Sequence, residues 1–202
     1  MNLEAVVWLK ISGACGILTP IVAFTCIFLA IASYPEFSWT GNALSDLGVQ
    51  EGVTAVLFNS GLIFSGILAL IFASGLLIFL YNKLLGRIGA FILVLGALAL
   101  IAIGIFPENV KPTHYYVSVA FFVLLLIAML VIGATFLLMA KVKMGLFTFL
   151  AAIVAVVVWV IQFPVRFIPS VAVPETVSAL LASMWSIVLG FKMLKQVSHS
   201  NK

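Results

Sequence analysis

Residues 53–80 read VTAVLFNSGLIFSGILALIFASGLLIFL and contain no charged side chain. A helix needs about 20 consecutive apolar residues to cross the hydrocarbon core of a bilayer, and this stretch exceeds that length. Inside lipid, a helix is also the form in which such a stretch satisfies its own backbone hydrogen bonds. The segment therefore predicts a transmembrane helix.

Five further stretches of the same character lie on either side of this one. Together they give six predicted spans, at residues 11–33, 53–80, 88–105, 114–140, 144–163 and 176–191. Of the 202 residues, 65% are hydrophobic and 8% charged, whereas about 25% charged residues are usual in a soluble domain. We therefore expect an all-α polytopic membrane helix bundle, folded as a single six-span transmembrane domain over residues 1–202.

The segments between the predicted spans, together with the two chain ends, alternate between the two sides of the membrane. Basic residues are divided unevenly between these two sets of segments. One set carries Lys10, Lys83, Arg87, Lys141, Lys143, Lys192, Lys195 and Lys202. The opposite set carries Lys111 and Arg166. Because short cytoplasmic loops retain Lys and Arg, this asymmetry predicts a multi-pass protein of the cell membrane with both ends inside.

The amino end leaves one alternative to that topology open. Ala30-Ile31-Ala32 resembles a signal-peptidase site, and cleavage there would leave five spans with the new amino end outside. The apolar run before it is longer than the usual signal core of about 7 to 15 residues, which favours a retained first span.

The interiors of the predicted spans hold almost no ionisable groups. His114 stands at the edge of the fourth span, and Cys15 and Cys26 lie in the first. Proton-coupled transporters, ion pumps and voltage sensors place charged residues within the membrane, so the sequence disfavours those functions. The scattered basic residues predict membrane lipid and no nucleic acid as a partner. Two histidines at opposite ends predict no metal or haem site, and we expect no cofactor.

Polar residues gather instead at the predicted outer ends of the spans. If the bundle closes compactly, they converge over one outward-facing polar pocket, with Asn59 about 9 Å in rise below Val53 at its floor. A lipid headgroup or a small amphiphile suits such a pocket, and the planar guanidinium of Arg166 suits a phosphate or carboxylate. The predicted ligand-binding residues are Asn42, Ser45, Asp46, Asn59, His114 and Arg166.

The same residues have structural explanations as well. Asn42 can cap a short interfacial helix that Gly48 ends, with Ser45 and Asp46 facing water. Arg166 can form an ion pair with Asp46 or with Glu175. His114 can be an ordinary interfacial polar residue at the start of a helix.

A catalytic function is a further alternative. A neutral His114 could act as general base with Asp46 orienting it, in a membrane-embedded hydrolase or acyl-transfer enzyme. Ser45 would be the candidate nucleophile, with Glu108 or Glu36 as the orienting acid in that arrangement. The sequence supplies these residue types without geometry, and no Gly-x-Ser-x-Gly elbow is present, so no catalytic residue is assigned.

Small residues recur at intervals of four within the second span, at Gly61, Ser65, Ala69 and Ala73. Such a row lets another helix approach closely. Packing within the chain is the expectation. A second subunit on this face would instead make the protein an oligomer and a scaffold or assembly subunit.

The loop after the first span carries the most specific motif of the chain. Residues 42–48 read NALSDLG and are followed by Phe58-Asn59 and later by Phe106-Pro107 and His114. In these motifs the chain resembles, over nearly its whole length, the uncharacterised prokaryotic membrane family catalogued as domain of unknown function 998. The resemblance implies a compact six-helix membrane unit and assigns no reaction, ligand or cofactor.

A fainter similarity is carried by Ser45-Asp46-Leu47-Gly48 alone. It resembles the loop after the first span in the Frag1, DRAM and Sfk1 group of eukaryotic six-span proteins. That likeness implies a lipid-related function at the outer leaflet, although a shared fold is not evidence for a reaction.

Overall fold

A computed structural model describes residues 3–200 of the chain, with side chains described up to Gln196. This part contains six long α-helices, one short 3-10 helix and no strand. Every α-helix is long and apolar enough to cross a bilayer. The elements are α1 (Leu3–Ala32), η1 (Leu44–Val49), α2 (Val53–Phe79), α3 (Leu84–Ile105), α4 (Thr113–Leu138), α5 (Val142–Val165) and α6 (Ala172–Ser200). The predicted six-span membrane helix bundle is confirmed.

Two helices extend well beyond their predicted spans. The first begins at Leu3, so Lys10 lies within it, and α6 continues to Ser200 past Lys192 and Lys195. The predicted spans stopped at these lysines because charged residues mark the edge of the hydrocarbon layer. The helices continue because long basic side chains reach toward the polar interface without interrupting the backbone.

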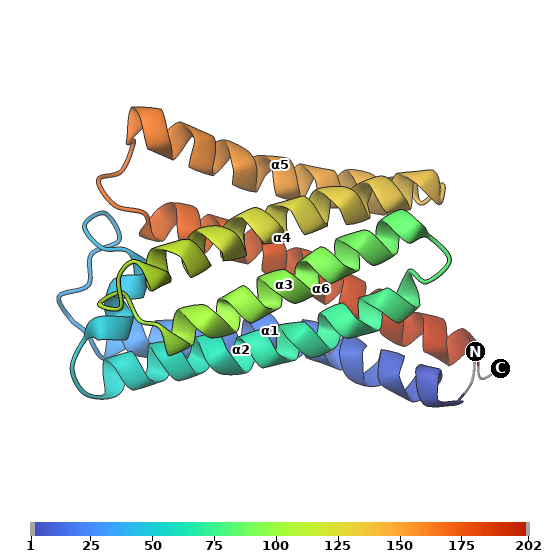
Figure 1. Ribbon diagram of the computed structural model, residues 1–202, viewed down its shortest axis with the longest axis horizontal. Coiled ribbons are helices and arrows are strands. Elements are labelled where there is room, and N and C mark those ends of the chain that lie inside the picture. Colours follow the sequence, from blue (N-terminus) through green and yellow to red (C-terminus); the bar gives the residue numbers. More distant parts are fainter. Residues whose placement is uncertain (1–2, 201–202) are drawn as a thin grey trace.

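The six helices form a closed ring. Each packs against its neighbours in sequence, and α6 returns to pack against α1. In Figure 1, α1 begins and α6 ends at one end of the bundle, whereas η1 lies at the opposite end. We call these the terminal end and the η1 end.

Glycines permit the contact that closes the ring. A Cβ on Gly13 of α1 would lie 2.9 Å from the carbonyl oxygen of Gly190, and a Cβ on Gly190 of α6 would lie 2.5 Å from that of Gly13. Both distances are too short for a real side chain. The two backbones therefore approach as closely as helices do in membranes when small residues face each other.

The row of small residues in α2 also packs within the chain. Gly61 faces Cys26 of α1, and Ser65 and Ala73 are fully buried. The remaining member of the row, Ala69, borders a cavity within the bundle, as Ser65 also does. Helices of the same chain thus occupy the face that motivated a scaffold function.

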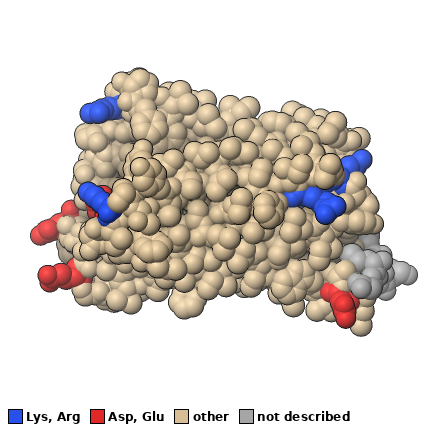
Figure 2. Space-filling model, viewed as in Figure 1, with Lys and Arg blue, Asp and Glu red and all other residues tan. Residues whose placement is uncertain are grey.

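Charge is separated between the two ends. Figure 2 shows charged atoms at both ends and an uncharged band between them, which matches a lipid-facing surface. Among the described residues, the η1 end carries Glu36, Asp46, Glu51, Glu108, Glu175, Lys111 and Arg166. The terminal end carries Lys10, Lys83, Arg87, Lys141, Lys143, Lys192, Lys195 and Glu4. The bundle is that of a multi-pass membrane protein, and the orientation with both termini inside stays a prediction.

Candidate functional site

Residues 44–49 fold back over the η1 end of the bundle as a plug, which we call the η1 plug. Leu47 is fully buried and Leu44 nearly so. They belong to an apolar cluster that includes Phe58 of α2, Ile103 of α3 and Ala172 of α6. Burial of a leucine side chain contributes about 1.5–3 kcal/mol, so these two residues anchor the plug between three helices.

Asp46 organises the backbone at the start of the plug. Its Oδ2 atom accepts hydrogen bonds from the Ala43 N–H at 3.0 Å and from the Asn42 side-chain amide at 2.8 Å. The Oδ1 atom of Asn42 in turn accepts the Ser38 N–H at 2.9 Å. The cap residue of η1 is Ala43, one position after Asn42, which was the predicted cap. The polar contacts of both side chains are thus local to the plug. They differ from the predicted cap, since Asp46 bonds to the backbone instead of only facing water and η1 ends at Val49 instead of Gly48.

Asn59 fixes the other end of the plug. Its Nδ2 donates to the Gly48 carbonyl oxygen at 2.8 Å, from the second turn of α2. A Cβ on Gly48 would lie 2.6 Å from Asn59 Oδ1, so a larger residue at this position would displace the Asn59 amide. The Oδ1 atom itself is buried without a partner. Asn59 is therefore engaged with the plug, and it is not among the residues that border the cavity described below.

Glu108, in the loop between α3 and α4, joins the plug to that loop. Its Oε2 accepts the Ser45 hydroxyl at 3.3 Å. Burial raises the pKa of Glu108, and hydrogen bonding to Asp46 and the negative charge of Asp46 raise it further. The bond from Ser45 and the nearby His114 oppose this shift. A protonated Glu108 can donate a hydrogen bond to Asp46, whereas two neighbouring ionised carboxylates repel each other.

Glu175 holds the plug from α6. Its Oε2 accepts the Leu44 N–H at 2.8 Å, and the Ala172 N–H donates to the Asn42 carbonyl oxygen at 3.3 Å. Three carboxylates, from η1, the α3–α4 loop and α6, thus meet around one short helix. Sequence reasoning placed Asp46 in the site but gave Glu108 and Glu175 secondary roles.

His114 is 7% exposed and lies at the start of α4. Its Nδ1 is 2.7 Å from the Phe106 carbonyl oxygen, which can only accept, so Nδ1 carries the proton. In the neutral ring, Nε2 then accepts from the Ser118 hydroxyl at 3.3 Å. The structure thus pairs His114 with Ser118, and no hydrogen bond links it to Ser45 or Asp46. Ser118 was missed, although a serine four residues after a histidine shares its helix face.

Arg166 stands apart from the other predicted ligand-binding residues. It caps α5 in a left-handed conformation, with φ 45°, and its side chain is exposed. No hydrogen bond or ion pair among the described residues joins it to Asp46 or Glu175. The loop that it begins is held by Gln162, whose Nε2 donates to the carbonyl oxygens of Ile168 at 2.8 Å and Ser170 at 3.0 Å.

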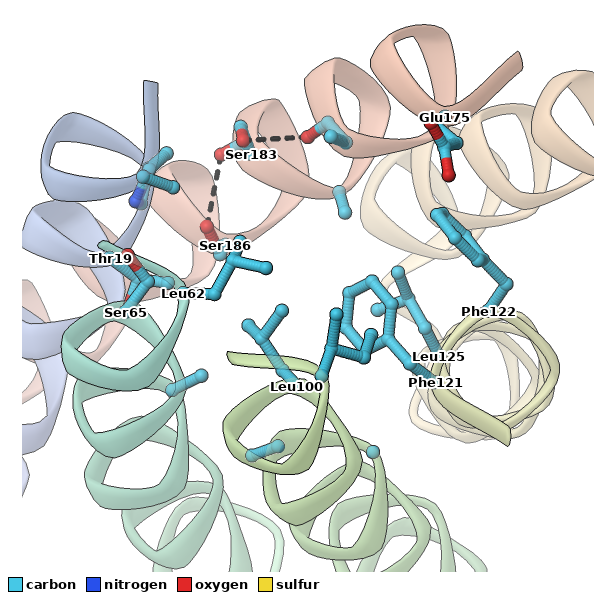
Figure 3. Close-up of a pocket in the computed structure, with 18 of the residues that line it drawn as sticks. Thr19, Leu62, Ser65, Leu100, Phe121, Phe122, Leu125, Glu175, Ser183 and Ser186 are labelled. Carbon is cyan, nitrogen blue, oxygen red and sulfur yellow. Dashed lines mark hydrogen bonds between the residues drawn. The ribbon is translucent and has the colours of Figure 1, made fainter. Parts of the chain in front are cut away.

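A cavity of about 160 Å³ lies inside the ring, beneath the η1 plug. Leu44, Ser45 and Glu175 border it at the plug, and Phe72 and Trp185 border it deeper in the bundle. Figure 3 shows Glu175 beside Phe122 at one side of the cavity and Thr19 and Ser65 at the other. The wall between them is made mostly of apolar side chains from α1, α2, α3, α4 and α6.

Two polar groups that border the cavity have no hydrogen-bond partner. The Ser65 hydroxyl and the Trp185 indole nitrogen are both buried and unpaired among the described residues. Thr19, Ser183 and Ser186 on the wall bond to carbonyl groups of their own helices. Ser45 and Ser118 bond to Glu108 and His114. Buried polar groups are normally paired, so the serine hydroxyl and the indole N–H are two donors that a molecule in this cavity could engage.

Metal binding has no support in the described part of the chain, where no three His, Cys, Asp or Glu side chains are grouped to hold an ion. The carboxylates around the plug accept hydrogen bonds from backbone and hydroxyl groups instead. The site therefore consists of an apolar cavity, two unpaired polar groups on its wall, and a polar plug above it.

Comparison with known proteins gives one match. No curated protein and no solved structure matches the chain. The profile of a family described as a protein of unknown function, DUF998, matches residues 17–192 and so covers all of α2 to α5 and most of α1 and α6. The fainter similarity to the Frag1, DRAM and Sfk1 group receives no support from this match and stays a prediction. Because the match spans most of the chain, the protein belongs to the DUF998 family of multi-pass membrane proteins.

Proposed function

We propose that the protein binds a small amphiphile in the cavity beneath the η1 plug. The observation that carries the proposal is the pair of unpartnered groups, Ser65 and Trp185, at the wall of an otherwise apolar cavity. An apolar ligand body suits the leucine and phenylalanine side chains. A hydroxyl or carbonyl oxygen on the ligand would accept from the indole N–H and the serine hydroxyl.

The size of the cavity narrows the choice between a small amphiphile and a membrane lipid. A dry cavity of about 150 Å³ holds a molecule the size of benzene. At about 160 Å³, this one takes a ring or a short branched chain. A small ligand fits this volume whole, whereas only part of a two-chain lipid would fit, so the smaller ligand is favoured.

The η1 plug supplies the polar end of this site. Glu175 and Ser45 border the cavity, and Asp46 and Glu108 lie on the plug and its neighbouring loop. A ligand hydroxyl or amine near Glu175 would meet a hydrogen-bond acceptor, since only Oε2 of that carboxyl is engaged by the plug backbone. His114 acts from the side, through Ser118, which also borders the cavity.

Native mass spectrometry of the gently extracted protein tests this function. Ala182 borders the cavity and Leu180, on the same helix, is 47% exposed on the outer surface. We expect a bound small molecule in the wild type and in Leu180→Phe, and its loss in Ala182→Phe, because only the second phenylalanine enters the cavity. Retention by both variants, or no bound species in the wild type, would refute the proposal.

Variants at the predicted polar residues refine the same experiment. Asp46→Ala removes the acceptor of the Ala43 N–H at the start of the plug and is expected to weaken ligand retention. His114→Ala removes the hydrogen-bond partner of Ser118 and is expected to do the same. Arg166→Ala is expected to retain the ligand fully, since its side chain is exposed and apart from the plug.

A serine hydrolase or acyl-transfer enzyme is the second candidate, favoured by the bond between Ser118 and His114. The Ser118 oxygen would attack an ester carbonyl carbon, and His114 Nε2 would take the hydroxyl proton. The ester C–O bond would break as the leaving alcohol receives that proton, and water or a second alcohol would then take the acyl group from Ser118. The Phe106 carbonyl oxygen would hold the ring in the required tautomer. Labelling by an alkyl fluorophosphonate would be lost in Ser118→Ala and kept in Ser45→Ala, and absence of labelling in the wild type would reject this candidate.

A further inference from the structure

A second cavity, of about 220 Å³, lies at the terminal end of the bundle. It is bordered by three lysines, one glutamine and two phenylalanines, and by no acidic residue among the described part of the chain. The residues are Phe79, Phe136, Lys141, Lys192, Lys195 and Gln196. They come from α2, α4, the turn before α5, and α6.

Lys141 is held at the rim of this cavity by the turn between α4 and α5. Ala140 has a positive φ of 55°, and the Lys141 N–H donates to the Phe136 carbonyl oxygen at 2.9 Å. The Lys141 ammonium lies 5.8 Å from the centre of the Phe79 ring, within the range of a cation–π contact. Its charge also stands beside the first turn of α5, which begins at Val142 and adds partial positive charge.

Lys192 and Lys195 approach the cavity from α6. Residues three apart lie on one helix face, so both ammonium groups are directed to the same side. The surrounding field is positive as well, because Glu4 is the one acidic residue at this end among those described. Figure 2 shows the basic side chains of this end beyond the uncharged band.

We propose that this second cavity binds a phosphate group, with Lys141 and Lys192 as its charged ligands and Gln196 as an amide donor. Lysine attracts phosphate as a point charge, and basic pockets between transmembrane helices take anionic headgroups. The phosphate comes from an anionic lipid of the adjoining leaflet or from a soluble phosphate. This site is separate from the amphiphile cavity and does not depend on the function proposed for it.

The test is a titration of the purified full-length chain with dioctanoyl phosphatidylglycerol, with dioctanoyl phosphatidylcholine, and with inorganic phosphate. The pocket variant is Lys141→Gln combined with Lys192→Gln. Its matched control is Lys83→Gln combined with Lys143→Gln, which removes the same charge at the same end, outside the cavity. Thermal unfolding of each variant verifies the fold before binding is compared.

We expect phosphatidylglycerol to bind the wild type more tightly than phosphatidylcholine, and the pocket variant to lose roughly thirtyfold in affinity, from two lysines near an anionic headgroup. The control variant keeps its affinity to within about twofold, and so does Lys141→Arg combined with Lys192→Arg, which retains both charges.

The three probes identify the source of the phosphate. If the affinities for inorganic phosphate and for phosphatidylglycerol fall equally in the pocket variant, the site is supported and assigned to a soluble anion. If only the affinity for phosphatidylglycerol falls in the pocket variant, the site is supported and assigned to a lipid headgroup. Equal losses in the pocket and control variants would show a general surface field and overturn the proposal, as would unchanged binding in both.

Discussion

Replacing Ser65 by alanine tests whether the unpaired hydroxyl beside the first cavity is a ligand-binding group. Ser65 is fully buried in α2, and its Oγ atom has no hydrogen-bond partner among the described residues. Alanine removes this oxygen and leaves the rest of the side chain in place. The change therefore alters hydrogen bonding while the helix packing stays nearly the same.

The sign of the effect depends on whether a ligand is present. Burying a hydroxyl without a partner costs about 1–3 kcal/mol in proteins, so Ser65→Ala stabilises the ligand-free protein by about that amount. For a chain of this size, each kcal/mol raises the melting temperature by about 2–4 °C. When a ligand oxygen bonds to Ser65, the variant loses a hydrogen bond that contributes about 0.5–1.5 kcal/mol. Ligand affinity then falls by roughly twofold to tenfold.

Thermal unfolding followed by tryptophan fluorescence measures both states, before and after exhaustive removal of the co-purified molecule in detergent. Ser74→Ala in the same helix is the control, because the Ser74 hydroxyl already donates to the Ile71 carbonyl oxygen at 2.7 Å. That variant should respond equally in the two states. If Ser65→Ala destabilises the ligand-free protein, the hydroxyl has a partner there and the inference from Ser65 is wrong.

Three further predictions concern the plug and the orientation of the bundle. Leu47→Ala leaves a void under η1 and should weaken docking of the plug by about 3 kcal/mol. Hydrogen exchange of the η1 amides should then be faster, while exchange of the α3 amides is unchanged. The pKa of Glu108 is raised, so the docked plug favours the neutral form of this carboxyl. Docking of the plug is therefore strongest below the ordinary carboxyl pKa and weakens as the pH rises through the raised pKa. Glu108→Gln should remove that pH dependence of η1 exchange, whereas retention of the full dependence would assign it to another group. The orientation can be tested in a variant that lacks Cys15 and Cys26 and carries a single cysteine in place of Glu36 or of Lys143. An impermeant thiol reagent applied to intact cells should label the cysteine at position 36 and not the one at position 143, and the reverse result would contradict the predicted topology.

The sequence predicted the helices well and the site partly, for reasons visible in single residues. Each span is an uncharged apolar run, and lipid leaves such a run no structure except a helix, so its position follows from composition. The helix ends were missed at Lys10 and Lys192, because a lysine marks the limit of the hydrocarbon layer and does not end a helix. Only a three-dimensional arrangement can show which polar groups share a neighbourhood.

Asn59 shows why the site could not be predicted in full. As a lone amide within an apolar helix, it was expected at the floor of a polar pocket. In the structure it donates to the Gly48 carbonyl oxygen, because the 3-10 helix folds back over α2. Ser65 and Trp185 had no special signal in the sequence, since a buried serine or tryptophan usually finds a partner. Their lack of one becomes apparent only when every neighbour is known.

The composition of the plug predicts that its docking depends on protonation. A permanent seal would need only apolar packing, as at Leu44 and Leu47, together with neutral capping groups. Instead, Asp46, Glu108 and Glu175 all engage η1, and like charges at short range oppose one another unless a proton is shared. Closure is then sensitive to protonation and to any ligand group that offers hydrogen bonds to these carboxyls. A ligand that bonds to the other oxygen of Glu175 would share this carboxyl with the Leu44 N–H, so ligand binding and docking of the plug would involve the same side chain.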